Sequence, residues 1–171
     1  MSNKRLHAFF AFLSVVILLI TLAIACGGSD EAEMKGKLKQ KINTEKFSLT
    51  VTSVASRSRV GGEYLNEKAP SGAIFVTVDF NYKNISKEPI SSFQVPEVKL
   101  IDPNNVSYDQ AIGATGYYAT QKNLNKKIAS DLNPGISQRD ASVFEVSKEN
   151  WSKKGWKLLI TADKNIEIPI K

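Results

Sequence analysis

Two hydrophobic patterns divide this chain. Residues 8–25 are mostly apolar and contain no charged side chain, and they include the aliphatic run at 15–20. From residue 47 onward, apolar and polar residues alternate instead. A short uncharged stretch is typical of an export signal, whereas alternation with period two is typical of half-buried β-strands. The pattern therefore predicts an export segment at residues 1–25 and a β-domain later in the chain.

The clearest predicted strand covers residues 74–82. Its apolar face consists of Ile74, Val76, Val78, Phe80 and Tyr82. Further β-compatible segments lie at 47–52, 98–101, 106–109, 141–146, 156–162 and 166–170, and turn-forming sequences lie at 84–89, 102–105 and 133–135. About seven short strands in residues 47–171 predict an all-β domain, an antiparallel β-sandwich.

Two connections in this predicted sandwich are long. Residues 55–72 and 110–127 exceed the usual length of a passive loop, and long loops often carry function. Residues 110–127 show no clear period, and residues 147–154 are compatible with one helical turn. Trp151 and Trp156 are expected to close the core.

Residues 26–46 separate the two patterned regions. They are rich in charge and poor in apolar side chains, so they are not expected to bury enough surface to fold alone. Met34, Leu38 and Ile42 recur every four residues, which leaves a short transient helix as an alternative. We predict a flexible tether.

The end of the apolar stretch has a recognisable sequence, Leu22-Ala23-Ile24-Ala25-Cys26-Gly27. It resembles the lipobox of bacterial lipoproteins, although Ala23 stands where leucine is frequent. The resemblance implies cleavage between Ala25 and Cys26 and attachment of a diacylglyceryl group, with fatty acids such as palmitate, to the Cys26 thiol. The alternatives are an uncleaved transmembrane anchor and an ordinary secretory signal with an incidental cysteine.

A lipid on Cys26 would place the protein on the extracytoplasmic face of a cell membrane, with the membrane itself as its first partner. Two acyl chains hold a protein firmly, because each buried methylene contributes about 0.8 kcal/mol. Gly27, rather than aspartate, follows the cysteine, so the lipoprotein pattern implies the outer membrane in a cell that has two membranes.

A second resemblance comes from two separated stretches. Asp79-Phe80-Asn81-Tyr82-Lys83-Asn84 ends a long strand, and Asn133-Pro134-Gly135 precedes Ser142-Val143-Phe144-Glu145-Val146. These stretches are similar to the telokin-like, immunoglobulin-fold domain of unknown function found in Gram-positive lipoproteins. The resemblance covers residues 47–171 and implies an immunoglobulin-like sandwich and a one-membrane cell. It carries over no catalytic residue.

Charge and residue usage exclude several kinds of chemistry. Without Lys4 and Arg5 of the export segment, 21 basic and 17 acidic side chains remain, a net charge of +4 that gives no nucleic-acid footprint. His7 is the only histidine and Cys26 the only cysteine. A Ser-His-Asp triad and a His-Cys zinc site are therefore not expected in the mature chain, and we predict no metal or cofactor.

The candidate binding surface is the pair Tyr117 and Tyr118 with nearby Lys122. Paired tyrosines in a polar loop can stack on sugars or anchor a protein partner. The alternative is that one ring packs over the open end of the sandwich.

These observations favour a lipid-anchored, non-catalytic binding module at the cell envelope. Its partner is expected to be an envelope protein, a wall polymer or a small ligand. Two acids that meet in space leave no local signature, so a carboxylate-based hydrolase of wall glycan or peptide stays an alternative. A structural subunit of an envelope complex is a third hypothesis.

Overall fold

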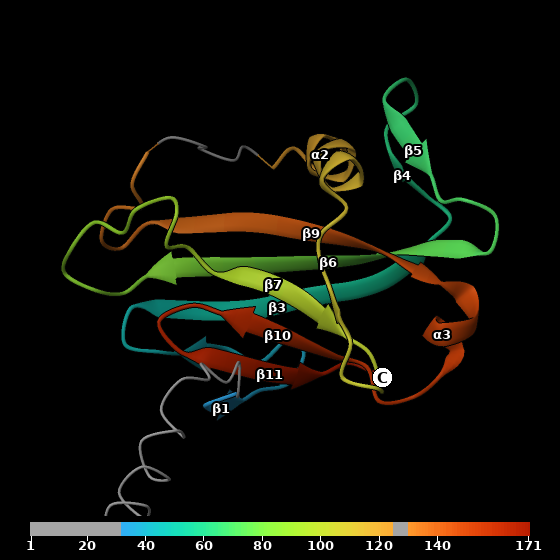
Figure 1. The fold of residues 1–171 in the computed structure, drawn as a ribbon. Coiled ribbons are helices and arrows are strands. Elements are labelled where there is room, and N and C mark those ends of the chain that lie inside the picture. The colour runs from blue at the N-terminus through green and yellow to red at the C-terminus, as the bar shows by residue number, and fades with distance from the viewer. Residues whose placement is uncertain (1–31, 125–129) are drawn as a thin grey trace, which may run out of the picture. The chain divides into compact units, whose positions relative to one another are not determined.

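The computed structural model describes residues 32–124 and 130–171, and the predicted export segment, with Ala25 and Cys26, lies outside the described residues. Two sheets form the body of the unit Ala32–Lys171 (Figure 1). The first has the order β1-β11-β10-β7-β8 and the second the order β2-β3-β6-β9. The strands of the first sheet are β1 (Met34–Lys35), β7 (Glu97–Ile101), β8 (Ser107–Tyr108), β10 (Lys157–Thr161) and β11 (Asn165–Pro169). Those of the second are β2 (Ile42–Asn43), β3 (Phe47–Arg57), β6 (Ala73–Asn84) and β9 (Ser137–Ser147).

The remaining elements lie outside these two sheets. They are the hairpin of β4 (Arg59–Gly61) and β5 (Asn66–Lys68), helix α2 (Ile112–Gln121) and the short helix α3 (Lys148–Ser152). Neighbouring strands pair antiparallel, except that β1 runs parallel to β11. This arrangement confirms the mostly-β prediction. The described residues contain eleven strands, more than the seven expected, because strands of two or three residues leave almost no periodic signal.

The main core lies between the two sheets. The predicted apolar face of β6 is buried there, and Val98, Leu100, Leu158, Ile160 and Ile168 from the other sheet belong to the same cluster. Trp156 is fully buried and Trp151 packs beside it, with ring centroids 5.1 Å apart, as expected for core closure.

The outer face of β6 and β9 carries a second, smaller core. Phe75, Ala141 and Val143 on the strands meet Ala114 and Tyr118 on α2. Helix α2 therefore covers the face of the second sheet that points away from the main core (Figure 1). Residues 110–127 were predicted to form a loop, and for residues 112–121 that prediction is wrong. Gly113 and Gly116 lower intrinsic helix propensity, so the burial of one helix face has to stabilise α2.

The folded domain begins earlier than predicted. Residues 34–43 cross from β11 of one sheet to β3 of the other, with Met34 paired with Ile166 and Ile42 paired with Leu49. Ile42 is 5% exposed and belongs to the main core. The prediction of a flexible tether is therefore wrong for residues 32–46, and Met34, Leu38 and Ile42 do not form a helix. The sequence pattern did not predict this strand pairing, because only alternate side chains of the segment face inward and charged residues lie between them.

Gly36 shows how closely this segment packs. A Cβ atom at this position would lie 2.2 Å from Cδ1 of Ile42 and 3.4 Å from Cγ1 of Ile168. A side chain here would thus force the end of the Ile42 side chain to move.

Candidate functional site

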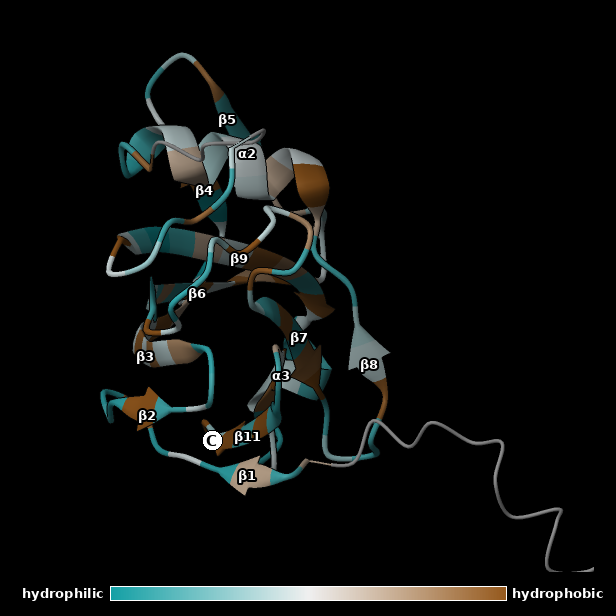
Figure 2. Cartoon of the chain, turned by 90° about the vertical axis from the view of Figure 1, so that its left-hand side faces the viewer, coloured by the Kyte–Doolittle hydropathy of each residue, from teal (hydrophilic) through white to brown (hydrophobic). Residues whose placement is uncertain are grey.

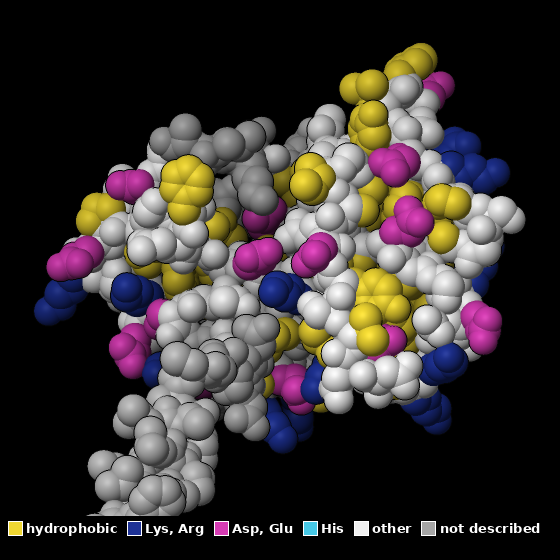
Figure 3. Space-filling model, in the orientation of Figure 1, with side chains coloured by type: hydrophobic (Ala, Val, Ile, Leu, Met, Phe, Trp, Pro, Cys, Tyr) yellow, Lys and Arg dark blue, Asp and Glu magenta, His cyan; other side chains and the backbone are white. Residues whose placement is uncertain are grey.

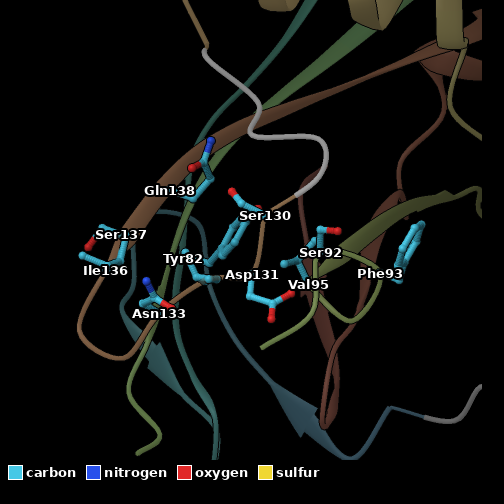
Figure 4. Close-up of a pocket in the computed structure, with 11 residues that line it drawn as sticks. Tyr82, Ser92, Phe93, Val95, Ser130, Asp131, Asn133, Ile136, Ser137 and Gln138 are labelled. Atoms are coloured by element: carbon cyan, nitrogen blue, oxygen red, sulfur yellow. The ribbon is translucent and has the colours of Figure 1, made fainter. Parts of the chain in front are cut away.

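A pocket of about 610 Å³ opens at the end of the sandwich where β6 ends and β9 begins. This volume falls within the range of sites for small ligands. Two loops, one after β6 and one before β9, form its walls (Figure 4). It is lined by Tyr82, Ser92, Phe93, Val95, Ser130, Asp131, Leu132, Asn133, Ile136, Ser137 and Gln138.

The two walls are joined by backbone pairing and by one buried amide. Ile90 and Leu132 exchange two backbone hydrogen bonds of 3.1 and 2.8 Å. The fully buried Asn84 side chain donates from Nδ2 to the carbonyl oxygens of Glu88, at 2.8 Å, and Leu132, at 2.7 Å. Its Oδ1 accepts from the backbone N–H and the hydroxyl of Ser86 at 2.8 and 2.7 Å. Asn84 therefore fixes the separation of the two loops.

Tyr82 forms part of the wall on the sheet side of the pocket. Its ring stacks with Phe80 at a centroid distance of 6.0 Å and meets Phe47 edge-on at 6.2 Å. Burial raises the pKa of the Tyr82 phenol well above its usual range, and the negative charge of Asp140 raises it further. The hydroxyl therefore stays protonated and can act as a neutral hydrogen-bonding group.

The remaining lining combines neutral polar groups with exposed apolar ones. Hydroxyls of Ser92, Ser130 and Ser137 and amides of Asn133 and Gln138 belong to the lining, and Phe93 lies at its outer edge, apart from the other side chains (Figure 4). The Phe93 side chain is 95% exposed, and it also borders a smaller hollow of about 300 Å³ on the other side of its loop. Figure 3 shows hydrophobic side chains exposed over these loops and again over the β4–β5 hairpin.

Acidic groups are sparse at this site. Asp131 is the single carboxylate among the described residues that line the pocket. Glycoside hydrolysis by two carboxylates needs a second acid that faces the first across the scissile bond. Within residues 32–124 and 130–171, no group of three His, Cys, Asp or Glu side chains could hold a metal ion.

The predicted surface of Tyr117, Tyr118 and Lys122 lies elsewhere, on α2. Tyr118 is 1% exposed, and its hydroxyl donates to Oδ2 of Asp79 at 3.2 Å. Lys122 Nζ lies 3.3 Å from the same carboxylate oxygen and 5.4 Å from the centroid of the Tyr118 ring. A hydrogen bond with Tyr118 raises the pKa of Lys122, and the charge of Asp79 adds to this against partial desolvation.

These contacts fasten α2 to β6. Arg57 also lies against the Tyr118 ring, with Cζ 5.6 Å from its centroid. Tyr118 therefore cannot belong to an exposed binding surface, and that part of the prediction is wrong because the loop is a helix with a buried face. Tyr117 is only half-buried, but its neighbour is a packing residue.

The pocket residues were not identified from the sequence. Residues 84–89 and 133–135 were expected to be turns, and the structure brings these two turns together. The available signal was Phe93, an isolated aromatic residue in a polar segment between Pro89 and Pro96. Asp102, in the predicted turn at 102–105, is 3% exposed, and its Oδ1 accepts from the N–H groups of Asn104 and Val106.

Within the described part of the chain, no helix has both the length and the apolar character needed to cross a membrane.

Fold and site together define a β-sandwich domain with a ligand-sized pocket at one end. Comparison with known families gives its place: the chain belongs to the family described as "Domain of unknown function (DUF4352)", whose model matches residues 36–163. It is 43% identical over 139 residues to the uncharacterized protein YxkC of Bacillus subtilis (strain 168), a match that covers 81% of this chain and 77% of YxkC.

Solved structures agree with the sandwich. A conserved hypothetical protein from Bacillus anthracis has a TM-score of 0.69 and 28% identity, over 77% of this chain and 93% of that one. An uncharacterized β-sandwich protein from Clostridium difficile 630 has a TM-score of 0.55 and 17% identity, over 85% and 99% of the two chains. A Bacillus subtilis protein described as a "putative lipoprotein" has a TM-score of 0.52 and 14% identity, over 78% of this chain and 38% of its own. At these identities the last two indicate the fold alone.

Proposed function

We propose that this protein is a lipoprotein anchored through Cys26 on the extracytoplasmic face of the membrane, and that its sandwich domain binds a ligand without catalysis. Two facts support the anchor. The sequence around Cys26 resembles a lipobox, and the name of one structural relative, from Bacillus subtilis, includes the word lipoprotein. The order of strands in two facing sheets supports an immunoglobulin-like, telokin-like sandwich.

The observation that carries the binding proposal is the pocket beside Phe93. A fully exposed aromatic ring is costly to leave in water, and here it borders a pocket that is also lined by hydroxyl and amide groups. The described lining carries no lysine or arginine. Neutral donors and acceptors next to an aromatic face suit a sugar, which presents hydroxyl groups at its edge and C–H groups on its face.

The ligand class proposed is therefore a glycan segment of the envelope. Neutral oligosaccharide fragments of the cell wall are the probes, and binding is measured by isothermal titration calorimetry. Phe93→Ala and Asn133→Ala are each expected to weaken binding by about fivefold, since one stacking or hydrogen-bonding contact contributes on the order of 1 kcal/mol.

Ile112→Ala is the matched control, because Ile112 is 85% exposed on α2 and does not line the pocket. Equal affinity of the Phe93 and Ile112 variants would reject the pocket as the binding site. Saturable binding together with release of shortened glycan would instead favour the hydrolase.

The anchor is tested separately by intact mass and membrane partitioning of the native protein and a Cys26→Ala variant. A native chain that begins at Cys26, carries acyl mass and loses membrane association on substitution supports the proposal. A native chain that keeps residues 1–25, or one released without lipid, contradicts it.

A further inference from the structure

The segment that closes one side of the sandwich carries a row of lysines. Between Met34 and Asn43 the chain has Lys35, Lys37, Lys39 and Lys41 and no acidic residue, and all four lysines are exposed. Met34, Gly36, Leu38 and Ile42 of the same segment face the core or pack against it. The segment turns at Leu38 and Lys39, where Lys39 has a φ of 63°, and β1 and β2 on either side of this turn pair with one sheet each. All four lysines therefore lie on the solvent side of a segment that is fixed to both sheets.

The acidic side chains closest to this row in sequence are already paired. Glu33 Oε2 lies 2.9 Å from Lys164 Nζ, and Glu45 Oε1 lies 4.0 Å from the same nitrogen. In the described residues none of the four lysines forms an ion pair. Glu167, which lies opposite Lys35 in the β1–β11 register, is paired with Lys157 at 2.8 Å. The four lysines therefore form a local group of positive charges outside the ion pairs of the described residues.

The early start of the domain leaves few residues between Cys26 and this row. Six peptide steps separate Cys26 from Ala32, where the folded unit begins, and an extended chain advances by at most about 3.6 Å per residue. If Cys26 carries lipid, the start of the domain lies within about 20 Å of the membrane surface. The 20-residue flexible tether expected from sequence would have allowed much more freedom.

Helix α2 and the β4–β5 hairpin lie far from the lysine row. Strand β1 lies on the side of the sandwich opposite α2 and the β4–β5 hairpin (Figures 1 and 2). An orientation with residues 34–43 toward the membrane therefore points α2 and the hairpin away from it.

We infer that residues 34–43 form a membrane-facing surface, in which Lys35, Lys37, Lys39 and Lys41 bind anionic phospholipid head groups. This inference rests on the lipid anchor proposed above. Positive side chains next to an acyl anchor supply a second attachment, and each strengthens binding to an anionic bilayer by about fivefold. The surface also fixes the orientation of the domain, which a lipid on a flexible tether does not.

The test uses the unlipidated chain from Gly27, so that binding reports the lysines and not the acyl chains. Every strand and both core clusters of the described residues lie within residues 32–171, so this chain keeps them all. Sedimentation with phosphatidylcholine vesicles, with and without phosphatidylglycerol, measures the partition coefficient. The native sequence is expected to bind only the anionic vesicles and to be released as salt rises.

The decisive variant replaces Lys35, Lys37, Lys39 and Lys41 by glutamine. Its partition coefficient on anionic vesicles is expected to fall by at least about tenfold. The control replaces four exposed lysines on and near β5 and α3 by glutamine: Lys68, Lys148, Lys153 and Lys154. This control has the same net charge but is expected to bind like the native chain. Circular dichroism melting of both variants checks that the fold is intact.

Three outcomes would overturn the inference. They are equal losses in both variants, no preference for anionic vesicles, and stronger binding to soluble poly(glycerol phosphate) than to vesicles at equal phosphate. The last would assign the lysines to a wall polymer. None of these results depends on Cys26 or on Phe93, so failure of this inference is distinct from failure of the proposed function.

Discussion

At the scale of single residues, Asn84 has the largest structural role in the pocket. Its side chain makes four hydrogen bonds to the backbone and side chain of the loop after β6 and to Leu132 in the opposite wall. Sequence alone indicated only a turn here, because the second partner lies 48 positions away. A buried polar group with every bond satisfied specifies one arrangement of the two loops.

We predict that Asn84→Ala destabilises the domain by about 2–4 kcal/mol, because it leaves buried carbonyl groups without donors. Urea unfolding measures this change. Asn81→Ala is the control, since Asn81 is exposed on the same strand, and it is expected to stay within about 0.5 kcal/mol of the native protein. Similar values for the two variants would show that the amide network contributes little.

Tyr82 gives a pH prediction. Because burial raises the pKa of its phenol in the folded state, the unfolded chain loses this proton first as the pH rises. The stability that depends on neutral Tyr82 is therefore present below pH 10 and is lost above it, by up to about 1.4 kcal/mol per pH unit.

Tyr82→Phe is expected to flatten this decline while leaving the part due to Lys122, whose pKa is also raised. Urea unfolding of both proteins on either side of pH 10 measures the difference. Parallel curves would contradict the assignment of the decline to Tyr82.

At the scale of elements, the edge strand β9 is protected from pairing with another chain. The N–H of Val143 donates to Oγ1 of Thr115 at 3.0 Å, and its carbonyl accepts from the N–H of Ala111 at 2.8 Å. The N–H of Ala141 donates to Oδ1 of Asp140 at 2.8 Å. The start of α2 and one acidic side chain thus occupy groups that an exposed edge would offer to a neighbour. Helix α2 serves this edge as well as the second core.

The segment from Met34 to Asn43 gives the sharpest test at this scale. Ile42→Ala is expected to lower the free energy of unfolding by about 2–4 kcal/mol, because it opens a cavity under the segment. If residue 42 belonged to a flexible tether, the same substitution would leave the free energy of unfolding unchanged. Lys41→Ala, on the exposed side, is expected to change stability by less than about 0.5 kcal/mol. If Ile42→Ala leaves the stability unchanged, the segment is a flexible tether and not part of the folded domain.

At the scale of the whole molecule, the notable features of the domain lie on two opposite sides and at one end. Strand β1 and the lysine row lie on one side, α2 and the β4–β5 hairpin on the other, and the pocket at the end where β6 meets β9 (Figure 1). If the anchor and the lysine surface hold as proposed, the pocket is presented at a fixed height above the lipid. Such a module presents its pocket in one orientation, whereas a module on a long flexible tether presents its pocket in many.

The sequence by itself determined the strand patterns and the turns. Residues 47–51 and 74–82 place alternate apolar side chains in the main core, and the turns at 102–105 and 133–135 occur where their residue types favour them. These features depend on neighbours within a few positions, so local pattern is enough to predict them. The export segment and Cys26 are also sequence predictions, and they remain predictions.

Only the tertiary structure decided where the domain begins, that residues 112–121 are a helix, and where the pocket lies. Ile42 is in the core because its strand pairs with β3 opposite Leu49, and Tyr118 is buried because α2 packs on β6 and β9. The pocket joins residues 82–95 to residues 130–138. Each of these features comes from partners distant in sequence, whose positions depend on how the two sheets pack.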